Sequence, residues 1–97
     1  MDVAKRFATN LIQHRKRANL TQEELGLRAE TNRSQIGKLE MGKTLPRLDT
    51  FLRLTGALAV STESLIEGIA WRPPQTEAGK FELTPPGAVG ADRSKSS

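Results

Sequence analysis

The chain has 97 residues, of which 36% are hydrophobic and 27% charged, and its formal net charge is +4. This size and composition are typical of one small soluble domain with a modest core, and they exclude a wholly disordered chain. The absence of cysteine excludes disulfides, thiolate metal sites and cysteine catalysis, and the single histidine, His14, excludes a histidine metal cluster. We therefore expect neither a metal ion nor a cofactor.

The sequence shows no signal for membrane insertion or secretion. Its longest apolar run is residues 57–60, far below the roughly 20 residues that span a bilayer. Lys5 and Arg6 are not followed by the apolar stretch of a signal peptide. We therefore expect a cytoplasmic protein without a membrane partner.

Basic side chains are concentrated in the first half of the chain. Residues 1–53 carry 11 basic and 6 acidic side chains, whereas the only charges in residues 54–70 are those of Glu63 and Glu67. The asymmetry favours a surface that binds a polyanion. A solvated helix face explains many such excesses, so the charge has to be read together with the motifs below.

Apolar residues recur at helical spacing through five segments of the chain. The expected helices span residues 3–18, 22–29, 33–41, 48–58 and 62–67. In the first of them Arg6 lies off the apolar face. In the fourth we expect Leu48 to point inward, with Leu52 and Leu54 flanking the core stripe or serving a dimer interface.

Start and stop signals separate these helices. Thr21 and Glu24 form a capping box, in which each side chain can bond the backbone of the other residue. Asn32 is a good N-cap for the third helix. Gly42 ends that helix, and Pro46 marks the loop that follows.

The composition changes after Gly68, because residues 73–97 hold four of the five prolines. We divide the chain into a helical domain, residues 1–68, and a C-terminal extension, residues 69–97. Within the extension we expect order in residues 69–84. Residues 85–97 have almost nothing to bury, and we expect them to be disordered.

The extension also holds two of the four aromatic residues, Trp71 and Phe81. Phe81 and Leu83 alternate with polar residues, which indicates a short strand. Two interpretations remain open for the aromatic side chains. They fold back over the helices, or they belong to a dimer interface.

A helix, a three-residue break and a second helix occupy residues 22–41, the arrangement of a helix-turn-helix. In that motif the N-terminus of the second helix enters the major groove of DNA. Here it carries Arg33, Ser34 and Gln35, with Lys38 one turn further on. Arginine can bond guanine and glutamine can bond adenine. Outside such a motif these residues would be taken for a solvated helix face.

The segments TQEEL at 21–25 and NRSQIGKLEMGKTLP at 32–46 resemble the Cro/C1-type helix-turn-helix, the lambda-repressor-like fold of the Xre family. The resemblance covers about residues 7–67. It implies an all-α, five-helix DNA-binding domain, here with a short, mostly irregular C-terminal tail. Members usually act as dimers on DNA operators.

The resemblance also implies roles for particular residues. The base-contacting set is Arg33, Ser34, Gln35 and Lys38. Gln22, Lys43 and Thr44 contact phosphates, and for Gln22 the helix N-terminus gives an independent reason, because its N–H groups favour an anion. For this residue the alternative is an exposed helix former. Arg15 and Glu40 form an ion pair between the first and third helices.

Four positions depart from the family pattern. Gly26 stands where alanine is frequent, Glu30 and Ala59 stand where glycine is usual, and His14 stands where an aliphatic residue is usual. A left-handed backbone costs a residue other than glycine on the order of 1 kcal/mol. We therefore expect some strain in the turn at Glu30, and we expect the departures to affect local geometry but not the fold.

We predict a dimeric repressor that reads a palindromic operator in double-stranded DNA. One alternative is an antitoxin-like autoregulator that also binds a toxin through its tail or its fifth helix. Another is a protein-interaction module that has lost DNA binding. We expect no enzyme activity, because the sequence offers no metal set, no cysteine and no glycine loop that cradles a phosphate.

Overall fold

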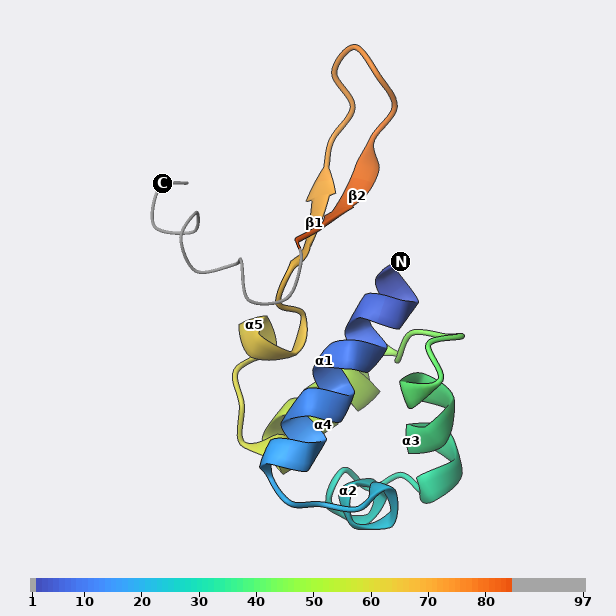
Figure 1. Ribbon diagram of the computed structural model, residues 1–97, viewed down its shortest axis with the longest axis vertical. Helices are drawn as coiled ribbons and strands as arrows, with labels where there is room; N and C mark the ends of the chain where they lie inside the picture. Colours follow the sequence, from blue (N-terminus) through green and yellow to red (C-terminus); the bar gives the residue numbers. More distant parts are fainter. Residues whose placement is uncertain (1, 85–97) are drawn as a thin grey trace.

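The computed structural model describes residues 2–84 and shows five helices followed by a β-hairpin (Figure 1). In chain order the elements are α1 (Val3–Arg17), α2 (Gln22–Arg28), α3 (Arg33–Glu40), α4 (Leu48–Leu58), α5 (Thr62–Leu65), β1 (Ile69–Arg72) and β2 (Lys80–Leu83). The five-helix prediction is confirmed, although α5 ends two residues earlier than expected. Within residues 2–84 no helix has the length and apolar content needed to traverse a bilayer. The disorder expected for residues 85–97 lies outside the described residues.

The predicted helix caps are present. The Thr21 hydroxyl accepts a hydrogen bond from the Glu24 N–H at 3.0 Å, and the Glu24 carboxylate accepts one from the Thr21 N–H at 2.8 Å. The Asn32 side chain accepts from the Gln35 N–H at 2.9 Å. Glu30 and Ala59 both have a left-handed backbone, with φ of 54° and 56°, as the family pattern predicts. The beginnings of α2 and α3, which frame the helix-turn-helix, are therefore set by local contacts.

The core lies between the helices, where each contributes one apolar face. The expectation for α4 is wrong in detail, because Leu48 is 72% exposed whereas Leu54 is fully buried. Leu48 is the first residue of α4, and helical side chains lean toward the N-terminus, so this one extends past the edge of the core. Leu52 is exposed. Leu54 points inward with Leu58 and completes the core.

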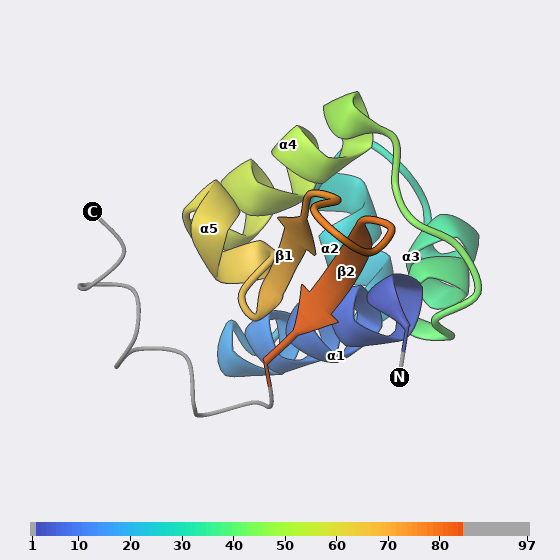
Figure 2. The same ribbon diagram turned by 90° about the horizontal axis from the view of Figure 1, so that it is seen from above.

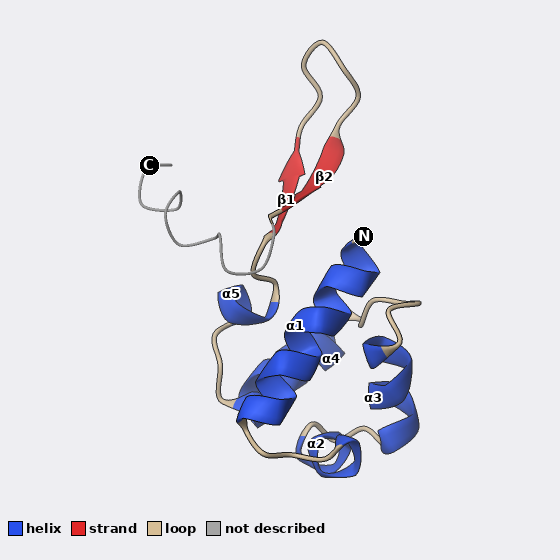
Figure 3. Cartoon of the chain, in the orientation of Figure 1, coloured by secondary structure: helices blue, strands red, loops and turns tan. Residues whose placement is uncertain are grey.

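The hairpin projects away from the helices (Figures 1 and 3). Its strands are antiparallel, with Ile69 opposite Leu83 and Trp71 opposite Phe81. These four side chains share one face of the hairpin, because strand residues alternate between faces. Ile69 packs against the core, but Trp71 and Phe81 are 54% and 56% exposed. The interpretation that both aromatic rings fold back over the helices is therefore wrong.

Arg6 holds the base of the hairpin against α1, although the sequence placed it off the apolar face. Its side chain is 1% exposed and donates hydrogen bonds to the Asn10 side chain and to the backbone oxygens of Glu67 and Thr84. When the molecule is seen from above, β2 crosses over α1 (Figure 2), and these two elements are in contact. Gly68 leaves room for the guanidinium, because an added Cβ would collide with it. The aliphatic pattern of α1 could not reveal this contact, because the residues that cover Arg6 lie at the other end of the chain.

Candidate DNA interface

The α2–turn–α3 unit is built on a very close approach between α2 and the start of α3. A Cβ added at Gly26 would lie 2.8 Å from the carbonyl carbon of Asn32 and 3.1 Å from the backbone nitrogen of Arg33. The Thr31 N–H also donates to the Gly26 oxygen at 2.8 Å. Glycine at position 26 therefore sets how tightly the two helices pack. The close approach explains why glycine stands at position 26, where the family pattern often has alanine.

The outer face of α3 is entirely polar. Ile36 and Leu39 are buried against the core. Four exposed side chains occupy the opposite side, namely Arg33, Ser34, Gln35 and Lys38. None of the four has a side-chain hydrogen bond or ion pair with any other residue in 2–84. Their donors and acceptors are therefore available to a ligand.

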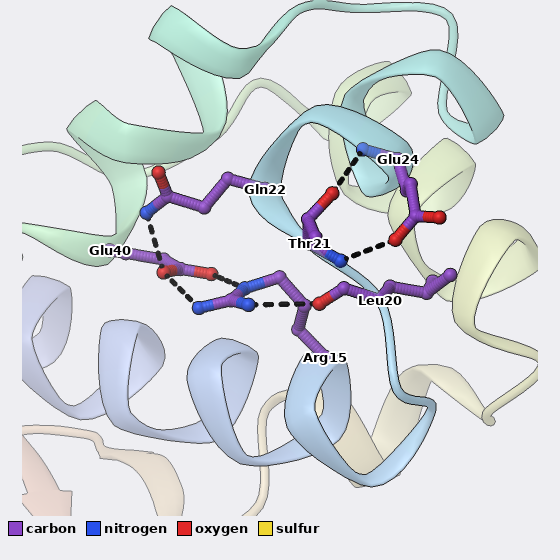
Figure 4. Close-up of polar contacts among 6 residues, drawn as sticks. All are labelled: Arg15, Leu20, Thr21, Gln22, Glu24 and Glu40. Atoms are coloured by element: carbon purple, nitrogen blue, oxygen red, sulfur yellow. Dashed lines mark hydrogen bonds and ion pairs between the residues drawn. The ribbon is translucent and has the colours of Figure 1, made fainter.

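A network of hydrogen bonds ties α1, α2 and α3 together behind this face (Figure 4). The Arg15 guanidinium binds the Glu40 carboxylate through two bonds of 2.6 and 3.0 Å, and it donates a third to the Leu20 oxygen. The hydrogen bond that Arg15 donates to Glu40 raises the pKa of the Arg15 guanidinium. Both side chains are largely shielded from solvent. A bidentate contact of this kind fixes angles as well as distance, so α3 cannot rotate freely against α1.

Gln22 belongs to the same network. Its side-chain nitrogen donates to the Glu40 carboxylate at 2.9 Å. The residue also lines an open hollow together with Arg33, Ser34 and Gly37. Sequence reasoning placed Gln22 at a phosphate and missed its bond to Glu40, because no local pattern links positions 18 residues apart.

Lys43 and Thr44 lie at the other end of α3, in the loop that leads to α4. Both are exposed, and within residues 2–84 the Thr44 hydroxyl donates a hydrogen bond only to the neighbouring Leu45 oxygen, at 3.4 Å. The chain turns into this loop at Gly42, where φ is 73° and the backbone lies against Lys5. The predicted base-contacting residues thus gather on the outer face of α3, with Gln22 beside its start and the loop residues past its end.

A family model described as helix-turn-helix, HTH_3, matches residues 11–65. The chain belongs to this Cro/C1-type helix-turn-helix family. It is accordingly a DNA-binding protein of the class that regulates transcription. No curated protein matches the chain.

Several solved structures share the fold. The restriction-modification controller protein C.AhdI from Aeromonas hydrophila is 29% identical, with a TM-score of 0.62, and the match covers 64% of this chain and 90% of that one. A hypothetical transcription factor from Neisseria, NHTF, is 23% identical over 67% of this chain and 75% of its own, with a TM-score of 0.63. The clp gene regulator ClgR from C. glutamicum is 17% identical over 68% and 86%, with a TM-score of 0.64. The latter two likenesses concern the fold alone.

Proposed function

We propose that this helix-turn-helix protein reads a specific DNA sequence by inserting α3 into the major groove. The observation that carries the proposal is the outer face of α3, whose four polar side chains have no partner in residues 2–84. An α-helix fits the major groove, and base edges there offer complementary donors and acceptors. The rigid support behind α3 favours recognition, because the helix itself is already held in place and need not be ordered on binding.

The four residues take different parts in this reading. Arg33 and Gln35 bond guanine and adenine edges, because their side chains can form two parallel hydrogen bonds with those bases. Ser34 and Lys38 contact bases on either side of them. These assignments rest on the exposure of the side chains and on their place in the motif.

The phosphate contacts come from Gln22, Lys43 and Thr44. The amide nitrogen of Gln22 carries two hydrogens, and Glu40 accepts only one of them. The second can donate to a phosphate while the first keeps the side chain in place. Lys43 supplies charge and Thr44 a hydroxyl from the loop after α3. Contacts at both ends of α3 would hold the helix in register on the duplex.

We further propose that two copies bind a palindromic operator and act as a repressor. One recognition helix reads too few base pairs for high specificity, so two half-sites about 34 Å apart along the duplex are expected. Occupation of an operator by two such domains would block access to the DNA beneath them. The related protein C.AhdI is a restriction-modification controller, which supports a regulatory role for this chain.

The test is to select bound DNA from a random pool with the full chain. The expected result is one enriched sequence with two inverted half-sites. A matched selection with an Arg33→Ala, Gln35→Ala double variant should lose the enrichment, whereas Gln13→Ala, on the exposed surface of α1, should retain it. If the unmodified chain enriches no sequence, the protein is an interaction module and the proposal is wrong. A single half-site without its inverted copy would contradict the dimer alone.

A further inference from the structure

The outer edge of strand β2 has backbone hydrogen-bonding groups without a partner among residues 2–84. The Thr84 N–H donates to the Gly68 oxygen at 2.7 Å, which makes these residues a hydrogen-bonded pair. Hydrogen-bonded and non-hydrogen-bonded pairs alternate along an antiparallel ladder. With the observed register, Phe81 and Trp71 form a non-hydrogen-bonded pair. The N–H and C=O of Phe81 therefore point away from β1, toward the open edge.

The two faces of the hairpin differ in polarity. One face carries the edge-to-face ring pair of Trp71 and Phe81, with centroids 5.0 Å apart. The other face carries charged residues, among them Lys80 and Glu82. Glu82 forms an ion pair with Arg72 at 2.6 Å. Lys80 has no ion-pair partner in residues 2–84. The hairpin projects beyond the helices (Figures 1 and 3), and both rings are more than half exposed. The hairpin is thus an exposed amphipathic edge of the kind that pairs with another strand.

We propose that β2 pairs with β2 of a second copy, antiparallel, about a two-fold axis at Phe81. The Phe81 residues of the two copies then form a hydrogen-bonded pair through the backbone groups that point outward. Lys80 stands directly opposite the partner's Glu82, and this contact occurs twice. The result is a four-stranded sheet with Trp71 and Phe81 of both copies on one face. The pairing deepens the dimer of the proposed function, on which its biological meaning rests.

Charge distinguishes this register from those centred on the two neighbouring residues. Moving the two-fold axis to Glu82 places Glu82 opposite the partner's Glu82. Moving it to Lys80 places Lys80 opposite the partner's Lys80. Like charges directly opposite one another in a sheet are unfavourable, whereas opposite charges are favourable. Of these three registers, only the one centred on Phe81 places opposite charges directly across from one another.

The edge of β1 does not offer an equivalent solution. A two-fold axis at Trp71 would place Ala70 opposite the partner's Arg72, so no oppositely charged pair forms. The start of β1 is also occupied, because the Ile69 N–H donates to the Ile66 oxygen at 3.1 Å and its side chain packs on the core. The second copy therefore docks on β2.

Sedimentation of the full chain without DNA tests the pairing through charge reversal. Lys80→Glu places two acidic pairs across the axis, and Glu82→Lys places two basic pairs there. Each variant alone should raise the dimer dissociation constant about tenfold or more. An equal mixture of the two variants restores opposite charges at both contacts, and it should form a heterodimer with nearly the original affinity. Leu48→Glu, a matched change on the exposed start of α4, should leave dimerisation unchanged.

Recovery of the heterodimer from two weakened variants would support this register, because general destabilisation cannot be repaired by mixing. Lys80→Glu removes no side-chain hydrogen bond or ion pair within residues 2–84, so its circular dichroism should equal that of the unmodified chain. The inference is wrong if the chain is monomeric, if both variants dimerise normally, or if mixing fails to restore the dimer. It is also wrong if Leu48→Glu abolishes dimerisation. A hairpin dimer that selects no DNA would overturn the proposed function only.

Discussion

Arg33 is the residue whose replacement best separates base reading from general attraction to DNA. Arg33→Ala removes a side chain that can bond a guanine edge, so it should cost about 1–3 kcal/mol on the selected operator and relax the preference at one base pair. Lys43→Ala, the control, should weaken specific and random DNA alike, because phosphates are the same in every sequence. Titrations with both DNAs measure the difference. Equal losses on both DNAs for Arg33→Ala would refute its part in base reading.

Glu40 is the centre of the polar network behind α3, since it accepts hydrogen bonds from Arg15 and Gln22. Glu40→Ala leaves the largely shielded Arg15 without its counter-ion, and removal of one partner of a buried pair is costly. We expect a loss of about 3 kcal/mol in the free energy of unfolding, measured with urea. Gln13→Ala, on the exposed surface of α1, should change it by less than about 0.5 kcal/mol. A similar small effect for Glu40→Ala would show that the pair contributes little.

Replacement by alanine should have opposite effects at two glycines, Gly26 between α2 and α3 and Gly56 within α4. At Gly26 an added methyl group would meet backbone atoms of Asn32, so Gly26→Ala should cost about 1–3 kcal/mol and weaken DNA binding by displacing α3. Gly56, within α4, has no atom within 4 Å of its added Cβ. Gly56→Ala should therefore stabilise the protein by about 0.5–1 kcal/mol through helix propensity. Thermal unfolding of both variants checks the opposite signs, and equal effects would contradict the packing argument.

The start of α2 should make stability depend on pH. The backbone hydrogen bond from Thr21 lowers the pKa of the Glu24 carboxyl, followed by the side-chain bond with the same residue. A lowered folded-state pKa stabilises the protein above the ordinary pKa of about 4.3, and the effect is lost as pH falls through the folded value. Glu24→Gln should therefore flatten the acid limb of the curve of stability against pH. Urea unfolding between pH 3 and 7 measures it, and an unchanged slope would contradict this origin.

For the whole molecule, the net charge of +4 and its position in the first half predict salt-sensitive DNA binding. Each phosphate neutralised adds about −0.9 to the slope of log affinity against log salt. Lys43→Ala should make the slope about one unit shallower, whereas Gln22→Ala should weaken binding without changing it, because a neutral amide releases no counterion. Binding titrations at several salt concentrations measure both slopes. A flat response with retained binding would contradict the proposed phosphate contacts.

The helices and the motif were predictable because their causes are local. The capping box of Thr21 and Glu24, the N-cap at Asn32 and the apolar spacing within each helix all act over a few residues. The exposed face of α3 follows from the same periodicity, so the base-contacting set could be named from the sequence. Leu48 was misplaced because periodicity shows the direction of a side chain but not where the core ends.

By itself, then, the sequence determined the five helices, the helix-turn-helix spacing and the family, since each depends on neighbours along the chain. Only the tertiary structure decided which polar residues are buried and which apolar ones are exposed. Arg6 is covered by contacts that reach 78 positions away, and Gln22 meets Glu40 only when α2 and α3 are docked. Phe81 lies opposite Trp71 of β1, and this pairing directs the backbone N–H and C=O of Phe81 outward. No local pattern predicts it, because strand pairing joins segments that are distant in the sequence.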